Sequence, residues 1–367
     1  MSLKCGIVGL PNVGKSSLFN AITKTQAAQA ENYPFCTIEP NSGQVAIKDE
    51  RLETLAKLAG SAEIIPNIIE LVDIAGLVKG ASKGDGLGNK FLSHIREVDA
   101  IIHLVRCFED ENIIHVNNKI DPLSDIETIN TELSLADLES VEKQIAKIEK
   151  KAKTDKILAA ELELLTKIKT HLDKGLLVSG LVDGFNEEEI VILKKLHLIT
   201  AKKVLYVCNV DEASIKNGNG HSNKVQQFAW QNECESLLIS VKIEGEISQM
   251  QSEEDKQFFL DELGLQNSGL DALAKKAFEV LNLITFFTIG PKEAHAWTLE
   301  KGKKAPQAAG VIHTDFEKGF IRAETIAYED YKTHGTELAC KEHGKLRLEG
   351  AEYIVQDGDV FHFRFNV

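Results

Sequence analysis

The chain has 367 residues, a hydrophobic fraction of 43% and a charged fraction of 27%, values typical of a globular protein of two or three domains. The sequence has no run of about 18 apolar residues, the length needed to span a membrane. The formal net charge of −14 argues against a protein that coats nucleic acid. The first strand begins too early to leave room for a secretion signal, and the six cysteines form no C-x-x-C pair, so we expect a cytoplasmic protein with reduced thiols.

The first predicted strand and helix enclose a complete phosphate-binding loop. Leu3–Val8 is a short apolar strand, Gly9–Ser17 contains the pattern G-x-x-x-x-G-K-[ST], and apolar residues resume at helical spacing from Leu18. A strand, a glycine loop and a helix in this order direct backbone N–H groups and a helix N-terminus at one anion. We expect Lys15 to contact the β- and γ-phosphates of a nucleotide and Ser16 to offer its hydroxyl to Mg²⁺.

Two further segments match the parts of a nucleotide switch. Thr37, within Tyr33–Ile38, is the candidate threonine that completes the ligand shell of the metal. The tetrapeptide from Asp73 to Gly76 follows the predicted strand Ile68–Val72 and supplies D-x-x-G. Its carboxylate would hold magnesium through water, and the N–H of its glycine would face the γ-phosphate.

The residue after this tetrapeptide bears on the rate of hydrolysis. Glutamine often stands there and orients the attacking water, but this chain has Leu77, whose side chain cannot hydrogen-bond. Either hydrolysis is slow or another group positions the water. His94 and His115 lie in the segments that follow, and a mobile loop could carry His115 to the phosphates; a surface histidine with no role is the alternative.

The base-reading motif departs from the guanine-specific pattern. GTP-specific proteins have N-K-x-D after the corresponding strand, whereas Val204–Cys208 is followed here by Asn209, Val210, Asp211 and Glu212. Val210 lacks the long stem that stacks over the base, and Glu212 places its carboxylate one methylene further out. We expect Asn209, Val210 and Glu212 to lie at the base end of a site that has lost the guanine clamp and reads adenine.

An insert too long for a strand crossover lies between about residue 128 and about residue 200. Apolar residues at alternating steps of three and four predict two antiparallel helices, from residues 138 to 152 and 158 to 172. The connection Lys143–Lys156 has six lysines and two acidic residues, so its charge is +4. This basic tip is a candidate contact for RNA phosphates; a solvated charged face is the alternative.

The remaining pattern is that of a doubly wound, mostly parallel α/β sheet followed by a smaller module. The apolar strand candidates of the sheet are Leu3–Val8, Ile68–Val72, Ala100–Val105, Val204–Cys208 and Leu237–Ser240. From Leu283 onward, short apolar stretches alternate with turn signals, as in a compact helix-and-sheet domain. We therefore predict a nucleotide-binding domain over residues 1–127 and 201–282, a helical arm over 128–200 and a C-terminal domain over 283–367.

Together these motifs resemble the Obg-like ATPase family, also called YchF. The resemblance covers essentially the whole chain and is carried by Gly9–Ser17, Tyr33–Pro40, Asp73–Ala81, Asn209–Glu212 and Gln356–Phe365. It implies a translation-factor-class P-loop G domain that prefers ATP over GTP, a helical hairpin inserted in that domain, and a C-terminal ubiquitin-like α+β domain, the TGS domain. It also implies the ribosome as the partner, chiefly its large subunit.

Carried onto this sequence, the resemblance implies a set of site residues. The nucleotide site is Asn12, Val13, Gly14, Lys15, Ser16 and Ser17, with Val210 near the base and Mg²⁺ on Ser16 and Thr37. Asn12 also matches a loop asparagine that binds potassium in some related GTPases, which leaves K⁺ as a second candidate ion. Two other functions stay open at this point: a GTPase switch, and a non-enzymatic RNA or ribosome adaptor whose conformation the nucleotide locks.

Overall fold

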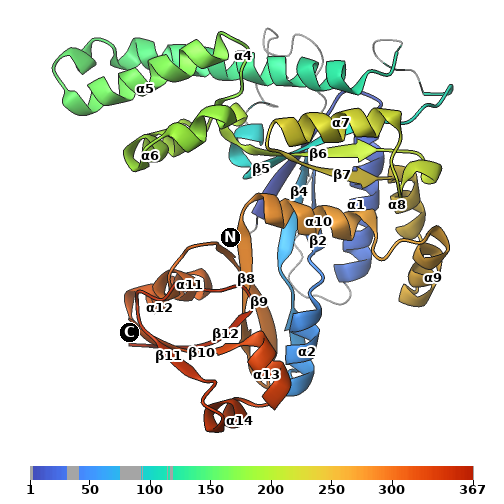
Figure 1. Ribbon diagram of the computed structural model, residues 1–367, viewed down its shortest axis with the longest axis vertical. Helices are drawn as coiled ribbons and strands as arrows, with labels where there is room; N and C mark the ends of the chain where they lie inside the picture. The colour runs from blue at the N-terminus through green and yellow to red at the C-terminus, as the bar shows by residue number, and fades with distance from the viewer. Residues whose placement is uncertain are drawn as a thin grey trace.

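The computed structural model describes residues 3–30, 41–74, 92, 94–113, 115 and 119–366, with side chains from residue 3 to 27 in the first range. Thr37, Gly76 and Leu77 lie outside the described residues. Figure 1 shows a central sheet with helices on its two faces, a long helical arm at the top left, and a second sheet with its own helices at the lower left. Across the described ranges, no helix is long and apolar enough to cross a membrane.

The central sheet has six strands in the order β2-β4-β1-β5-β6-β7. Their bounds are β1 (Leu3–Val8), β2 (Ser42–Ala46), β4 (Ile68–Asp73), β5 (Ala100–Arg106), β6 (Lys203–Asn209) and β7 (Glu235–Ile239). The pairs β1–β4, β1–β5, β5–β6 and β6–β7 are parallel, and β2 runs antiparallel to β4 at one edge. The predicted α/β sheet is thus confirmed; the edge strand β2 is not among the predicted strands.

Helices cover both faces of the central sheet. They are α1 (Lys15–Ala30), α7 (Gly220–Gln231), α8 (Val241–Ile247) and α10 (Gly269–Val280), and a further helix, α9 (Glu253–Leu263), packs against α8. The core lies between the strands and the apolar sides of these helices: Leu18, Ile22 and Leu273 are fully buried against it. Because both faces are covered, the central strands are almost wholly apolar, and all seven residues of β5 are buried.

The arm contains the two predicted antiparallel helices, α4 (Pro122–Ile148) and α5 (Lys156–Leu172), joined by the 3₁₀ turn η2 (Lys151–Lys153). α4 begins earlier than the predicted insert because Asp121 caps it and a proline occupies its first turn. A third helix that the sequence pattern did not predict, α6 (Glu187–Leu196), packs beside the pair between η3 (Val178–Gly184) and η4 (Ile199–Ala201).

Asp137 fastens the root of the arm to the body of the molecule. Its fully buried carboxylate accepts hydrogen bonds from the backbone N–H groups of Ile199 (3.0 Å) and Thr200 (2.7 Å). The same carboxylate lies 3.3 Å from the guanidinium of Arg96. A buried carboxylate with this many donors holds the two chain segments at a defined angle.

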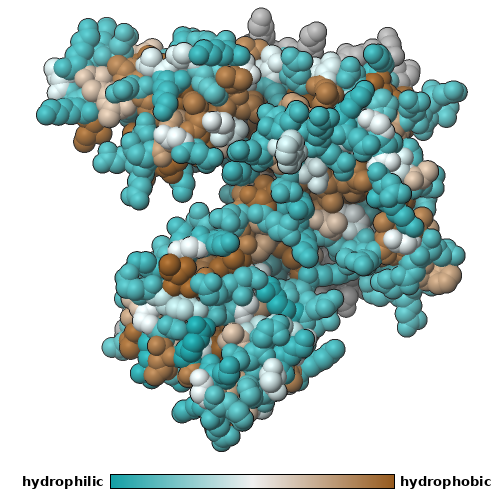
Figure 2. Space-filling model, viewed as in Figure 1, coloured by the Kyte–Doolittle hydropathy of each residue, from teal (hydrophilic) through white to brown (hydrophobic). Residues whose placement is uncertain are grey.

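The second sheet also has six strands, in the order β11-β10-β12-β8-β9-β3. Their bounds are β3 (Glu63–Ile65), β8 (Leu283–Ile289), β9 (Glu293–Glu300), β10 (Phe320–Ala327), β11 (Arg347–Glu349) and β12 (Asp359–Phe365). Its helices are α2 (Glu50–Ala59), α11 (Ala305–Ile312), α12 (Thr314–Lys318), α13 (Tyr328–His334) and α14 (Glu337–Glu342). The predicted α+β domain is present, and Figure 2 shows the surface hollowed between it and the arm.

One segment, Glu50–Ile65, differs from the division predicted from the sequence. The strand β3 pairs in parallel with β9, and Leu52 and Leu55 of α2 are buried beside Phe287 of β8. Residues from the first half of the chain therefore belong to the second sheet by contact. The limits 1–127 with 201–282, 128–200 and 283–367 stay a proposal, from which this segment departs.

Candidate nucleotide-binding cleft

A cleft of about 1240 Å³ opens at the carboxyl ends of the parallel strands. The loops that follow β1, β5, β6 and β7 and the last residue of β4 contribute to its walls. Its lining residues are Pro11, Asn12, Gly14, Lys15, Ser16, Ser17, Asp73, Phe108, Glu109, Asp110, Ile113, Asn209, Val210, Asp211, Glu212, Ala213, Ser240, Val241 and Lys242. Ligands of open α/β sheets bind at this edge, because the loops there converge on a crevice.

The phosphate loop needs its glycines. Gly14 has φ +105°, and a Cβ at this position would lie 2.6 Å from the amide nitrogen of Asn209. A Cβ on Gly9 would collide with the backbone oxygen of Leu104 on β5. Close approach of the loop to the neighbouring strands thus excludes any side chain at the two glycines. Asn12 adopts φ +63°, a conformation that asparagine tolerates better than most residues.

Lys15 lies inside this loop rather than in solvent. Its Nζ donates to the backbone oxygens of Gly9 (2.6 Å) and Leu10 (2.8 Å), and the residue is 9% exposed. Burial lowers the pKa of Lys15 to about 8, and the carboxylate of Asp73 opposes this shift. An ammonium group in this loop, at the N-terminus of α1, is suited to binding the phosphates of a nucleotide.

Oxygen donors of the kind that magnesium prefers line the same cleft. Ser16 and Ser17 are exposed on the first turn of α1, and Asp73 ends β4. Burial raises the pKa of Asp73, and the charge of Lys15 opposes that rise. A hydroxyl and a carboxylate next to a phosphate site match the hard ligands that Mg²⁺ prefers. Ser16 and Asp73 therefore fit the ion. The other predicted metal ligand, Thr37, and the predicted γ-phosphate contact, Gly76, lie outside the described residues.

Asn209 joins the phosphate loop to the loop after β7. Its side-chain nitrogen donates to the backbone oxygen of Val13 (2.9 Å), and its side-chain oxygen accepts from the N–H of Val241 (3.1 Å). Asn209 is 5% exposed, and Val13 is 1% exposed and not itself part of the lining. Asn209 thus both lines the cleft and holds two of its loops together.

The predicted base end of the cleft combines a buried apolar side chain with an ion pair. Val210 is 2% exposed, and its N–H donates to the backbone oxygen of Ile239 (2.8 Å). Glu212, in the short turn η5 (Glu212–Ser214), lies 2.6 Å from Nζ of Lys242. This pairing engages the carboxylate that occupies the position nearest to the guanine-reading aspartate of GTP-specific proteins.

One wall of the cleft was missed by sequence reasoning. Phe108, Glu109, Asp110 and Ile113 come from the loop that follows β5. The only sequence signal was their position, directly after a central apolar strand whose carboxyl end must face the same edge of the sheet as the phosphate loop. They match no motif, so the pattern alone did not single them out.

The structure does not bring His115 to the cleft. The histidine is 6% exposed, lies outside the lining residues, and its Nε2 is 2.9 Å from Oδ2 of Asp125 in the first turn of α4. A buried imidazole beside a buried carboxylate differs from the residue of a mobile loop that the sequence suggested. The water-positioning role of His115 therefore stays a prediction that this arrangement does not itself support.

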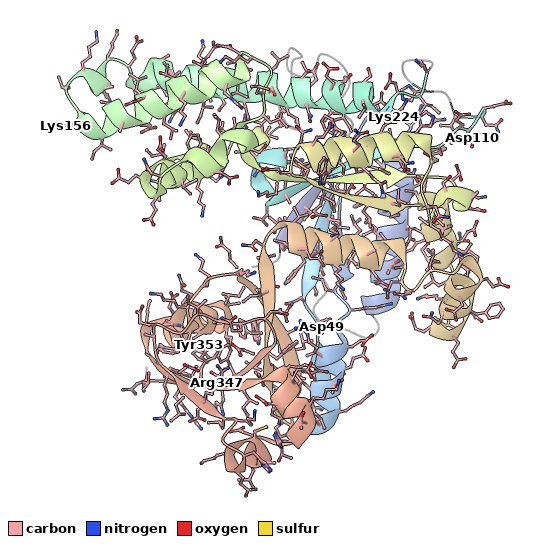
Figure 3. The ribbon with its side chains drawn as sticks, viewed as in Figure 1. Asp49, Asp110, Lys156, Lys224, Arg347 and Tyr353 are labelled. Atoms are coloured by element: carbon pink, nitrogen blue, oxygen red, sulfur yellow. The ribbon has the colours of Figure 1, made fainter. Side chains whose placement is uncertain are left out.

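The lysine-rich tip is far from the cleft. Lys147, Lys150, Lys151 and Lys153 are all exposed at the end of α4 and in η2. Figure 3 labels Lys156 at the free end of the arm and Asp110 of the cleft wall at the opposite side of the molecule. The 27 residues of α4 span about 40 Å between these regions.

Comparison with family models gives two matches. A model described as "50S ribosome-binding GTPase" matches residues 4–162, and the YchF-GTPase C-terminal model, described as a protein of unknown function, matches residues 283–366. The first match includes the phosphate loop, Asp73 and the cleft wall after β5, and the second covers the second sheet and its helices except β3 and α2.

Full-length relatives carry consistent names. The chain is 54% identical to the "Ribosome-binding ATPase YchF" of Bacillus subtilis and 50% identical to that of Escherichia coli O157:H7, over 100% of both chains in each case. It is 46% identical to "Obg-like ATPase 1" of Gallus gallus, over 100% of this chain and 93% of the relative. A solved structure of the Schizosaccharomyces pombe YchF GTPase has a TM-score of 0.87 at 38% identity, covering 99% of this chain and 98% of the other.

Proposed function

Because the chain belongs to the YchF family of Obg-like ATPases, we propose that it is a ribosome-binding ATPase that binds and slowly hydrolyses ATP in the cleft. The observation that carries this proposal is the match over the whole chain to proteins named ribosome-binding ATPases, together with a complete phosphate loop on the cleft wall. Association with ribosomes would place the protein in the cytoplasm.

Preference for ATP over GTP is supported by the base end of the cleft. Val210 stands where a stacking lysine stem is found in GTP-specific proteins, and Glu212 pairs with Lys242. Guanine would leave its N1–H and N2–H₂ donors without the aspartate that usually accepts from them, and unpaired buried donors are costly. A GTPase is the second candidate, favoured by the names of the solved S. pombe relative and of the matching N-terminal family model.

Mg²⁺ is the proposed cofactor, held by Ser16 and Thr37 with Asp73 nearby. When bound it would supply positive charge that offsets the negative charge of the phosphates. Lys15 would then donate to phosphate oxygens in place of the backbone oxygens of Gly9 and Leu10. Potassium at Asn12 is kept as a second candidate ion.

Slow hydrolysis follows from the residues available to orient water. Leu77 replaces the usual glutamine, and His115 is bound to Asp125 away from the cleft lining. We propose Lys15, Asp73 and Gly76 as the groups that act on the triphosphate. His115 could assist only after leaving its carboxylate partner.

The proposed ribosome contacts are the lysine-rich tip and the C-terminal domain, directed chiefly at the large subunit. The exposed lysines of the tip support phosphate binding. The arginines of the C-terminal domain give weaker support for phosphate binding, because they pair with acidic residues of the same domain. Arg322 and Arg364 pair with Glu324, and Arg347 pairs with an aspartate of the same domain.

Nucleotide affinities on the purified protein test the proposal. We expect ATP to bind about tenfold or more tightly than GTP in the presence of Mg²⁺, by isothermal titration calorimetry. Tighter binding of GTP would favour the GTPase candidate instead.

Ribosome pelleting with ATP, with ADP and without nucleotide tests the partner. Binding in any of these states, combined with measurable phosphate release from ATP, supports a ribosome-binding ATPase. Ribosome binding with no hydrolysis under any condition would favour the non-enzymatic adaptor.

A further inference from the structure

Arg106, the last residue of β5, is a buried arginine that binds backbone rather than carboxylates. It is 1% exposed. Three guanidinium nitrogens donate to three different backbone oxygens: Nε to Phe108 (3.2 Å), Nη1 to Ile113 (2.9 Å) and Nη2 to Asp110 (3.3 Å). The guanidinium carbon also lies 4.7 Å from the centre of the Phe108 ring. Removing a guanidinium from water is costly. The hydrogen bonds to backbone offset part of that cost, and the question is what structure they hold in place.

The three carbonyls belong to one loop, Phe108–Ile113, which forms the cleft wall that matches no sequence motif. Within the loop, the N–H of Ile113 donates to the backbone oxygen of Asp110 (3.2 Å), and the N–H of Asn112 donates to the carboxylate of Asp110 (2.8 Å). Arg106 supplies a rigid planar group with fixed donor directions, which a flexible lysine would not. The loop is thereby wrapped around a single side chain.

Cys107, just before the loop, is hydrogen-bonded to residues at the proposed base end of the cleft and beyond it. The N–H of Cys107 donates to the backbone oxygen of Asn209 (2.8 Å), and its carbonyl accepts from the side-chain amide of Asn219 (2.7 Å). The phosphate-binding residues come from a different loop, after β1. The wall held by Arg106 therefore continues the end of the cleft formed by Asn209 and Val210.

We infer that Arg106 is a positioning residue that shapes the wall Phe108–Ile113 around the nucleoside part of the bound nucleotide. Arg106 touches no ligand itself and acts through the loop. The inference rests on the proposed function, since it concerns the same cleft. It predicts that Arg106 contributes to binding of the base and ribose, and that it contributes nothing to binding of the phosphates.

Two ligands separate these contributions: ATP, and inorganic tripolyphosphate, which lacks the nucleoside. Calorimetry with Mg²⁺ measures both dissociation constants for the full chain and for Arg106→Met. We expect the affinity for ATP to fall about tenfold or more, because three backbone carbonyls of the wall lose a charged donor that fixes their positions. The affinity for tripolyphosphate should stay within about twofold.

Arg96→Met is the matched control. Arg96 also donates to backbone oxygens, those of His197 (3.0 Å) and Ala136 (3.3 Å), but it does so at the root of the arm. It should leave both affinities unchanged. If Arg106→Met does not fold, Arg106→Lys retains a charge and can serve only part of the loop; it should show the same selective loss in smaller measure.

Three outcomes would overturn the inference. Unchanged ATP affinity in the Arg106 variants leaves the proposed function intact and removes this role. An equal loss for ATP and tripolyphosphate shows that Arg106 acts only on the stability of the whole site. Failure of the parent protein to bind ATP at all would overturn both the proposed function and this inference.

Discussion

At the scale of single residues, Asn209 connects parts of the cleft that the chain supplies from distant positions. One amide group serves as donor to Val13 and as acceptor for Val241. An amide offers a donor and an acceptor from the same planar group. The geometry of the phosphate loop relative to the base end therefore depends on this side chain.

Replacing Asn209 tests that dependence. Asn209→Ala should lower ATP affinity about tenfold or more, because it leaves a buried carbonyl and a buried N–H without partners. Asn209→Asp should lose affinity as well, since its carboxylate would face the oxygen of Val13. Asn186, which caps α6 in the arm, is the control: Asn186→Ala should bind ATP as the parent does. Parent-like affinity in both Asn209 variants would contradict this account.

His103 is a buried titratable residue beside the cleft. It is 2% exposed on β5, and its ring centre lies 5.5 Å from that of Tyr206. Burial lowers the pKa of His103 to about 3, and the charge of Lys15 adds to the shift. The folded protein thus keeps the ring neutral where the unfolded chain would bind a proton. The contribution of the neutral ring to the free energy of unfolding is therefore fully present above pH 6.5, the ordinary pKa of histidine. It is lost as the pH falls from 6.5 toward 3.

The pH dependence of unfolding measures this contribution. Between pH 7 and pH 5, the free energy of unfolding should fall by about 2 kcal/mol through His103, at about 1.4 kcal/mol per pH unit below the ordinary pKa. Urea titrations should show a flatter pH dependence for His103→Gln than for the parent. The exposed His94 provides the control, and His94→Gln should keep the parent slope. Equal slopes for His103→Gln and the parent would contradict the buried, neutral assignment.

At the scale of elements, the arm places the basic tip far from the nucleotide-binding cleft. Its two long helices bury Val141, Leu165 and Ile168 between them, with α6 alongside, so the hairpin is held by apolar packing. The lysines of its tip are free of that packing and exposed. Changing them should therefore alter surface charge without altering the fold of the arm.

Ribosome binding of a four-lysine variant tests the role of the tip. We expect the combined change of Lys147, Lys150, Lys151 and Lys153 to alanine to flatten the salt dependence of ribosome pelleting. Each lost phosphate contact should reduce the log–log slope by about 0.7–0.9. ATP affinity and hydrolysis should not change, because the tip lies about 40 Å from the root of α4. Salt-dependent sedimentation identical to that of the parent would show that the arm is only a solvated spacer.

At the scale of the whole molecule, the segment from α2 to Asn67, which includes β3, ties the two sheets together. Asn67, 7% exposed and just before β4, donates to the hydroxyl of Thr285 (3.0 Å) and accepts from that of Thr298 (2.9 Å). Arg51 of α2 lies 2.6 Å from Asp357 of the C-terminal domain. Both ends of this segment lead directly into strands of the nucleotide-binding sheet.

Unfolding of an Asn67 variant tests this connection. Asn67→Ala should lower the free energy of unfolding by about 1–3 kcal/mol, because the two threonine hydroxyls lose a buried partner. The two sheets should still unfold in one transition by calorimetry, since α2 and β3 belong to the packing of the second sheet. The exposed Asn232 is the control, and Asn232→Ala should change stability by a few tenths of a kcal/mol. Two separate transitions, only one of them shifted, would contradict the coupling.

The features that depend on local residue patterns can be predicted from the amino-acid sequence alone. The phosphate loop is recognised by glycine and lysine spacing, the parallel strands by short apolar runs, and α4 and α5 by apolar steps of three and four. These signals are readable because each arises within a few turns of helix or a few residues of strand. In the structure, Lys15, Asp73 and Asn209 line one cleft, because the carboxyl ends of parallel strands meet at one edge of the sheet.

Other features emerge only when the chain packs into its tertiary structure. The pairing of β3 with β9 joins segments that are distant in sequence. The burial of His115 against Asp125 and the loop wrapped around Arg106 join residues near each other in the chain, but through contacts that no residue spacing predicts. The hydrogen-bonding groups of an edge strand or a buried arginine can be satisfied by many segments of the chain. Which segment does so is settled when the two sheets and the arm pack together, because burial then requires every one of these polar groups to find a partner.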